Sequence, residues 1–175
     1  MNNLMQQLQA PFADSDIEWR AQQVGTGNNG PWAMVLAYVT NRAIMARLDD
    51  VFGPLGWQNQ YRDIPGGGVE CGISVYDSTS QQWVTKWDAA DNTQVEATKG
   101  GRSDSMKRAA VQWGIGRYLY KLDATFAQCG TGYPGNDVKH MATRCNFAKK
   151  GQPANYGYWL KPQLPEWAQL KQGAK

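Results

Sequence analysis

Apolar residues recur at helical spacing between residues 34 and 52, where they are Leu36, Val39, Ala43, Ile44, Leu48 and Val51. Because a helix turns about 100° per residue, positions three and four apart line one face. Gly53 and Pro54 follow, and neither residue favours continuation of a helix. We therefore predict a helix over residues 34–52, preceded by a Gly/Asn-rich loop over residues 22–31.

In the middle of the chain, apolar positions alternate with polar or small ones, which is typical of strands with one buried face. Residues 57–64, 69–76 and 82–89 are the predicted strands. The first two are separated by a Pro-Gly-Gly-Gly turn, and the last two by a polar turn over residues 77–81. Turns of this length join neighbouring antiparallel strands, so the pattern predicts a three-stranded antiparallel meander.

A long helix is predicted over residues 103–122, after a loop of small residues over residues 97–102. Ser103 is a suitable N-cap, and Asp104 places an anion in the first turn, where the helix dipole favours it. Gly114 and Gly116 each cost a helix roughly 1 kcal/mol relative to Ala. We expect this glycine pair to let the sheet or a neighbouring subunit approach closely.

This order of elements predicts an α+β fold in which a three-stranded antiparallel meander packs on one long helix and is preceded by another helix. Residues 1–126 would form one domain. Residues 127–175 would form an irregular, basic segment with scattered aromatic residues, packed on that domain or flanking it.

The charges are divided unevenly along the 175 residues. Residues 1–98 contain 5 Lys or Arg and 11 Asp or Glu, whereas residues 99–175 contain 13 and 4. Such a division indicates a basic face that could bind nucleic acid, or acidic and basic surfaces that meet in self-association. A surface gradient without function remains the alternative.

The cysteines and the apolar stretches indicate the cellular compartment of the protein. Cys71, Cys129 and Cys145 are far apart and form no C-x-x-C pair, which argues against a disulfide framework and a zinc site. The N-terminus lacks the basic and apolar regions of a signal peptide. No stretch approaches the roughly 18 apolar residues of a membrane span. We expect a cytoplasmic protein that does not bind membranes.

The predicted long helix contains the candidate binding residues. On one continuous helix, Lys107 and Tyr118 lie near one meridian, with Arg117 and Lys121 to one side. Lys99 and Arg102 would enter from the preceding loop. Such a face could track phosphates and offer one ring for stacking. An ordinary amphipathic helix with a solvated basic face is the alternative.

Two motifs add a family resemblance. Lys107-Arg108-Ala109, followed by Gly-Ile-Gly-Arg-Tyr-Leu-Tyr over residues 114–120, resembles the signature of the Rad52 family of single-strand annealing proteins, especially its bacteriophage branch. Upstream, the stretch from Tyr38 to Phe52-Gly53, followed by Gly56-Trp57, resembles the helix of that family that ends in Phe-Gly. The resemblance covers about residues 19–123.

The resemblance implies a ring of about ten or more subunits, with a basic groove that holds single-stranded DNA by its backbone while the bases face outward. Lys107 matches the groove lysine, Arg108 the arginine after it, and Tyr38 a tyrosine at the groove base. Arg20 matches a groove arginine before the glycine-rich loop. Val111 replaces a basic residue of the eukaryotic members, and Arg117 or Lys121 could compensate.

The resemblance therefore implies ATP-independent annealing of complementary strands in homologous recombination and DNA repair, without catalysis or cofactor. A host or phage single-strand-binding protein is an expected partner. A plain single-strand-binding module that protects DNA is the first alternative, and a scaffold whose basic face binds only acidic neighbours is another. A metal-dependent nuclease would need converging carboxylates, for which Asp88, Asp91 and Glu96 are the candidates.

Overall fold

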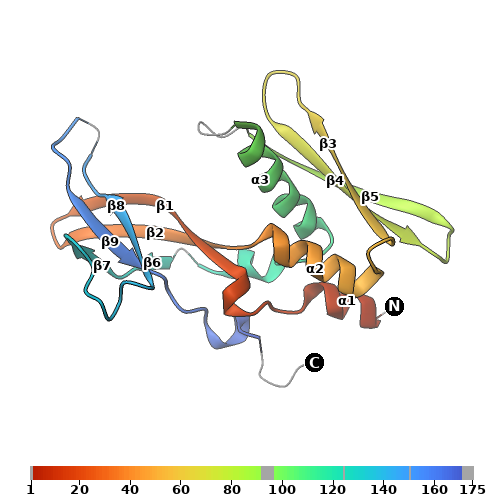
Figure 1. Ribbon diagram of the computed structural model, residues 1–175, viewed down its shortest axis with the longest axis horizontal. Coiled ribbons are helices and arrows are strands. Elements are labelled where there is room, and N and C mark those ends of the chain that lie inside the picture. The colour runs from red at the N-terminus through yellow and green to blue at the C-terminus, as the bar shows by residue number, and fades with distance from the viewer. Residues whose placement is uncertain (1, 92–96, 124, 150, 171–175) are drawn as a thin grey trace. The chain divides into compact units, whose positions relative to one another are not determined.

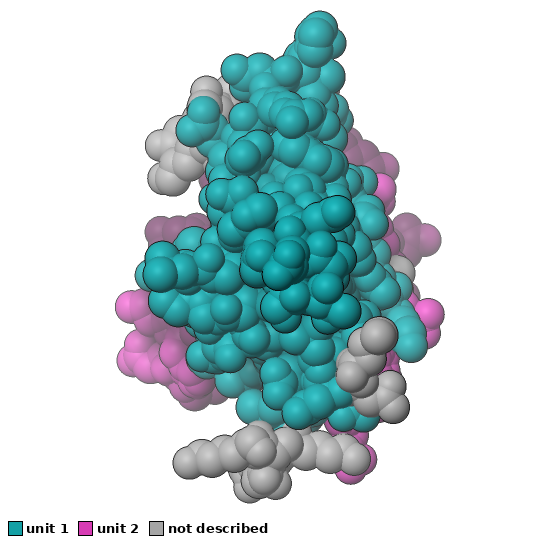
Figure 2. All heavy atoms as spheres, turned by 90° about the vertical axis from the view of Figure 1, so that its right-hand side faces the viewer, with its two compact units in different colours: residues 1–17, 39–121, 168–175 teal, residues 18–38, 122–167 magenta. Residues whose placement is uncertain are grey.

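The computed structural model describes residues 2–91, 97–123, 125–149 and 151–170. The chain forms two compact units, each built from separate stretches of sequence, which Figure 2 shows in teal and magenta. The first unit comprises Met1–Ile17, Val39–Lys121 and Ala168–Lys175, and the second comprises Glu18–Tyr38 and Leu122–Trp167. None of the described helices is both long and apolar enough to cross a membrane.

The first unit contains an antiparallel sheet and the main helices (Figure 1). Its elements are α1 (Asn2–Gln9), η1 (Asp14–Asp16), α2 (Asn41–Phe52), β3 (Trp57–Asp63), β4 (Val69–Asp77), β5 (Gln82–Ala90), α3 (Ala97–Gln112) and η2 (Arg117–Lys121). The strands pair in the order β3-β4-β5, and α3 packs against β4 and β5. The three strands lie within one residue of the predicted ranges, and the fold is α+β as expected.

The core of this unit lies between the sheet and α3. Strand β4 is buried from Cys71 to Val75, because α3 covers one face and Trp87 of β5 lies across Gly72 on the other. A Cβ atom on Gly72 would lie 2.7 Å from the indole ring of Trp87. Burial raises the pKa of the Cys71 thiol to about 11, so this cysteine is a packing residue and not a nucleophile.

The helix predicted over residues 34–52 is shorter than expected, and this prediction is wrong for its first part. Residues 30–39 form β2 (Gly30–Val39), which pairs with β1 (Ile17–Gly27), and the predicted loop over residues 22–31 is the end of this hairpin. Ala33, Val35 and Val39 are buried, and their even spacing places them on one face of the strand. The helix begins after Thr40, whose hydroxyl oxygen accepts a hydrogen bond from the Ala43 amide at 3.1 Å.

The boundaries of the second predicted helix also differ. Helix α3 begins at Ala97, where a loop was expected, and its small residues Gly101 and Ser105 are buried. It ends at Gln112 instead of continuing to residue 122. Gly114 and Gly116 adopt positive φ angles of 96° and 68°, which break the helix. The glycines do allow a close approach, but in a turn, and the side chains that approach them are Gln9 and Val39 and not the three-stranded sheet.

The second unit consists of two small sheets around one apolar cluster. Sheet β1-β2-β6 includes β6 (Thr125–Ala127), and sheet β7-β9-β8 contains β7 (Cys129–Thr131), β8 (Ala142–Asn146) and β9 (Tyr156–Leu160), followed by η3 (Glu166–Ala168). Ala33, Val35, Ala127, Phe147 and Trp159 form the cluster. The segment after residue 127, which was expected to be irregular, thus contains an ordered antiparallel sheet.

Arg47 of α2 holds the N-terminal segment against this helix. Its guanidinium donates to the carbonyl oxygens of Gln7 at 2.8 Å and Ala10 at 2.9 Å, and to those of Leu8 and Pro11 at 3.3 Å. The same group lies 4.0 Å from the centroid of the Phe12 ring. Burial lowers the pKa of Arg47, although the nearby acidic groups act in the opposite direction.

Replacing Arg47 with Lys should lower the free energy of unfolding by about 1.5–3 kcal/mol, the usual contribution of hydrogen bonds to a charged group. A lysine keeps the charge but cannot reproduce the planar fork of donors. Urea denaturation would measure the change. Arg42→Lys, at an exposed position of the same helix, is the matched control and should be neutral. Equal stabilities of the two variants would contradict this role.

Replacing Gly116 with Ala should destabilise the protein more than the same change at Gly66. Both glycines have positive φ angles, but a Cβ on Gly116 would lie 2.7 Å from Cγ2 of Val39, whereas nothing lies within 4 Å of one on Gly66. The backbone cost is common to both, and the crowding at Gly116 adds typically about 1–3 kcal/mol. The midpoint of urea denaturation should be lower for the Gly116 variant than for the Gly66 variant. Equal midpoints would show that the Val39 side chain moves aside at no cost in free energy.

A candidate nucleic-acid interface

Helix α3 has a buried face made of small residues, and it carries basic residues on the rest of its surface. Gly101, Ser105 and Ala109 recur every four residues and are all buried. The buried hydroxyl of Ser105 donates to the Arg102 carbonyl at 3.1 Å, which satisfies its hydrogen-bonding requirement. Lys107 lies on the side of α3 opposite these small residues, whereas Arg102 and Arg108 flank them and are exposed.

Lys107 and Arg108 are neighbours in sequence but lie in different surroundings. The Lys107 side chain is only 15% exposed, and its ammonium nitrogen lies 3.7 Å from Oδ1 of Asp104, one turn earlier. The Arg108 side chain is 53% exposed, and its Nε donates to Oδ1 of Asp88 on β5 at 3.0 Å. The two cations thus diverge, as expected for adjacent positions about 100° apart on a helix.

Asp88 is a well-stabilised carboxylate. Burial raises its pKa, but hydrogen bonds from the Ala89 amide, the Gln112 side chain and Arg108 outweigh this effect, so that the pKa lies below its usual value. Asp88 therefore stays ionised at neutral pH and keeps Arg108 beside the sheet. An anion that approaches Arg108 would compete with this carboxylate.

Arg102 lies on the same helix and is exposed. Its guanidinium carbon lies 5.4 Å from the centroid of the Tyr61 ring of β3. Burial, together with the neighbouring Cys71 thiol, raises the pKa of Tyr61 to about 12, so the ring stays neutral. Lys99 belongs to α3, but its side chain lies outside the described part of the chain.

Arg117 and Lys121 do not share a helix face with Lys107, and that prediction is wrong because α3 ends at Gln112. Arg117 turns back and donates to the carbonyl oxygens of Val111 and Gln112, both at 2.9 Å. It thereby neutralises the negative end of the α3 dipole and satisfies terminal carbonyls. Lys121 lies at the end of η2 and is exposed.

Tyr118 was expected to offer a stacking ring beside these cations, but the structure gives it another position. Its hydroxyl accepts a hydrogen bond from the Phe12 amide at 3.1 Å, and the side chain is half-buried. Burial also raises the pKa of Tyr118. It is therefore a packing residue of the first unit.

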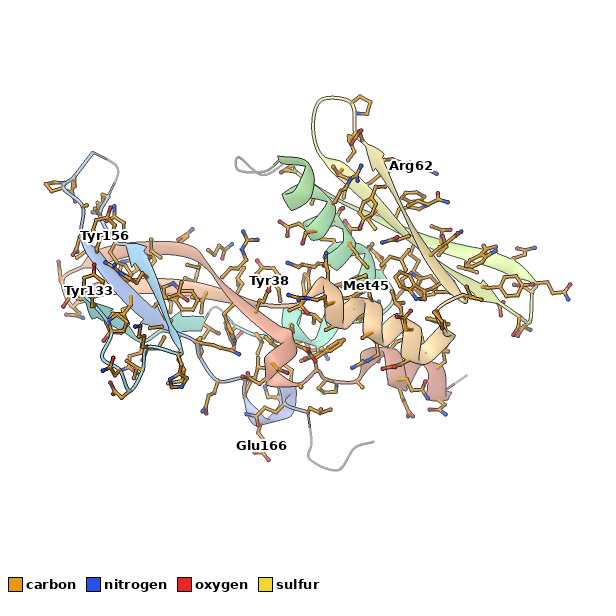
Figure 3. All side chains as sticks on the ribbon, viewed as in Figure 1. Tyr38, Met45, Arg62, Tyr133, Tyr156 and Glu166 are labelled. Atoms are coloured by element: carbon orange, nitrogen blue, oxygen red, sulfur yellow. The ribbon has the colours of Figure 1, made fainter. Side chains whose placement is uncertain are left out.

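The two remaining candidates belong to the second unit. Arg20 lies on β1 and is exposed, whereas Tyr38 lies near the end of β2 and is partly buried (Figure 3). Each has an interaction with other parts of the protein. The structure thus places six of the predicted basic residues along α3 and η2, and the remaining two candidates on the hairpin.

Sequence reasoning missed Arg62, which lies on the face of the meander opposite α3 (Figure 3). Its guanidinium carbon lies 3.9 Å from the centroid of the Trp87 ring and its NH1 lies 3.7 Å from Glu70. The register pairs Arg62 with Glu70 and Gly72 with Trp87. The strand alternation could have revealed this cluster, because paired residues share a face of the sheet.

Of the carboxylates that could have suggested a nuclease, Asp88 has another role. Asp88 binds Arg108, Asp91 is exposed, and Glu96 lies outside the described residues. Within the described parts of the chain, no group of three or more His, Cys, Asp or Glu residues could hold a metal ion.

Comparison with known proteins identifies the family. Residues 1–136 match the model of the Rad52/22 family double-strand break repair protein. The single-stranded DNA-binding protein DdrA of Deinococcus radiodurans is 31% identical over 170 residues, which cover 96% of this chain and 68% of the relative. Its namesake from Deinococcus deserti is 28% identical over 170 residues, covering 96% of this chain and 71% of the relative. The resemblance in the two motifs is thus confirmed, and the chain belongs to the Rad52/22 family of double-strand break repair proteins.

Proposed function

We propose that this protein binds single-stranded DNA and pairs complementary strands in double-strand break repair, without ATP and without a catalytic step. The observation that supports it best is the concentration of cations on α3 and η2 in a chain that belongs to the Rad52/22 family. The two DdrA relatives, which are named for binding single-stranded DNA, support the choice of ligand.

The proposed contacts follow from the surroundings of each cation. Lys107 is held nearly in place by the helix and Asp104, so it loses little conformational freedom when a phosphate replaces that carboxylate. Arg108 and Arg102 offer exposed guanidinium groups on either side of it. Each contact releases counterions from the DNA, so binding should weaken steeply as salt increases.

Val111 leaves a gap in this row of cations, and Lys121 is the better candidate to fill it. Arg117 already uses two donors to bind the carbonyls at the end of α3. Lys121 is exposed, and the helix end places no comparable demand on it. We therefore propose that Lys121 contacts phosphate and that Arg117 acts mainly by holding the turn.

Arg20 and Tyr38 remain proposed contacts to the backbone, and Lys99 a proposed contact at the start of α3. We also propose that about ten or more subunits form a ring, which would hold a strand extended with its bases free to sample a second strand. Base pairing then supplies the sequence specificity, and a host or phage single-strand-binding protein is the proposed partner.

A protein that only protects single strands is the second candidate, because both relatives are named for binding and not for annealing. The two functions have opposite effects on pairing. A protector should slow the pairing of two complementary oligonucleotides, whereas an annealing protein should accelerate it in the absence of ATP. A fluorescence assay that reports pairing of labelled strands separates them.

Lys107→Met should weaken binding of a labelled single-stranded oligonucleotide about tenfold, as expected for loss of one charged hydrogen bond. It should also reduce the slope of binding against salt by about one counterion and slow annealing. Asp104→Asn is the matched control, since it breaks the same ion pair but keeps the cation. The proposal fails if both variants bind as the unchanged protein does, or if that protein retards no oligonucleotide at low salt.

Lys121→Ala and Arg117→Ala should have different consequences. Lys121→Ala should weaken DNA binding and reduce the salt slope without changing the melting temperature, because the residue is exposed on η2. Arg117→Ala should lower the free energy of unfolding by about 1.5–3 kcal/mol through loss of its hydrogen bonds to the helix end. An unchanged salt slope for Lys121→Ala would rule out its compensation for Val111.

A further inference from the structure

The second unit contains an aromatic and basic surface that the proposed function leaves unused. It lies on the outer face of sheet β7-β9-β8. Along β9, Gly157 and Trp159 are buried, so the alternation turns Tyr156 and Tyr158 to the opposite side. The register pairs Arg144 of β8 with Tyr158, which places the arginine on the same outer face.

Arg144 lies between two exposed tyrosine rings. Its guanidinium carbon lies 3.9 Å from the centroid of the Tyr133 ring and 5.9 Å from that of Tyr156. Tyr133 is 79% exposed and Tyr156 is 58% exposed. Figure 3 shows both tyrosines beside the same sheet. We call these three residues the Tyr–Arg platform.

Gly130 of β7 extends this surface. It pairs with Tyr158 across the strands, and a Cβ atom on Gly130 would collide with the ring of that tyrosine. The ring therefore lies across the bare backbone of β7, in the space that a side chain would fill. This arrangement adds a third tyrosine to one side of the same sheet.

The composition of the surface matches single-stranded nucleic acid. Nucleobases stack on tyrosine rings and on the planes of arginine guanidinium groups. Between Cys129 and Lys161 the sequence has five Lys or Arg residues and one acidic residue, Asp137, so this segment has a net positive charge, which attracts phosphates. An apolar protein partner would instead be matched by aliphatic side chains, and the platform has none.

We propose that the Tyr–Arg platform binds bases of single-stranded DNA by stacking. This second contact differs in chemistry from the phosphate contacts of α3. It rests on the proposed function, because it brings the same ligand to another surface.

The test compares two oligonucleotides of equal length, one of thymidines and one with abasic sugars. Both have the same phosphates, but only the first has bases to stack. The unchanged protein should bind the thymidine strand more tightly. Tyr133→Leu with Tyr156→Leu should weaken binding of that strand roughly tenfold for each base that loses its stacking partner. The abasic strand should be bound as before.

Tyr133→Phe with Tyr156→Phe is the matched control, since phenylalanine keeps the ring and should keep the preference for bases. Thymidine binding that is equal in the Leu and Phe variants would overturn the platform and leave α3 as the contact. Failure of the unchanged protein to bind either strand would overturn both proposals. Equal weakening for both strands would show that the substitutions act on phosphate contacts or folding, and would overturn stacking.

A second measurement uses the unchanged protein and does not depend on how the variants fold. An oligonucleotide containing 5-iododeoxyuridine, irradiated in the complex, should crosslink to peptides that contain Tyr133 or Tyr156. Mass spectrometry of the digested complex identifies them. Crosslinks found only in peptides of the first unit would contradict the proposal.

Discussion

The end of α3 is the constraint on which the first unit depends. Trp113 must be buried immediately after the helix, where its indole N–H donates to the Ile73 carbonyl at 3.0 Å and its ring lies 4.5 Å from the Lys86 ammonium. The chain then passes Val39 with no room for a side chain at Gly116. Because the backbone must reverse at this point, the helix cannot continue, and Arg117 returns to its last carbonyls. The same turn fixes which cations remain available on the surface.

The charge pattern along the sequence takes on another meaning in the structure. Asp88 lies in the acidic half of the chain and Arg108 in the basic half, yet they form an ion pair within one subunit. Part of the division between the halves is therefore neutralised internally by the packing of α3 on β5, and does not require a neighbouring subunit. Two of the cations proposed to bind DNA, Lys107 and Arg108, already pair with carboxylates, and a phosphate would take the place of those carboxylates.

The meander was predictable from the sequence because apolar residues alternate with polar or small ones along its strands, which is typical of a sheet that packs one face on a helix. The β1–β2 hairpin was not, since Leu36, Val39 and Ala43 happen to match a helical period across a boundary that only the Thr40 cap reveals. The candidate residues of α3 could be identified from the motif, but the directions in which their side chains point could not. Those depend on where Gly114 and Gly116 turn the chain, and a glycine in the sequence does not show whether it breaks a helix or only lets it pack closely.

Stacking on the Tyr–Arg platform is compatible with strand pairing only if pairing is more favourable in free energy than stacking on the protein. A base that lies against Tyr133 or Tyr156 cannot at the same time stack in a duplex. Stacking on a protein ring contributes about 1–3 kcal/mol per base, and a step of DNA duplex contributes on average about 1.4 kcal/mol. These energies are similar for one base, but a duplex gains its contribution at every step, whereas the platform offers a few rings. A complementary strand would therefore displace the bases from the platform one after another.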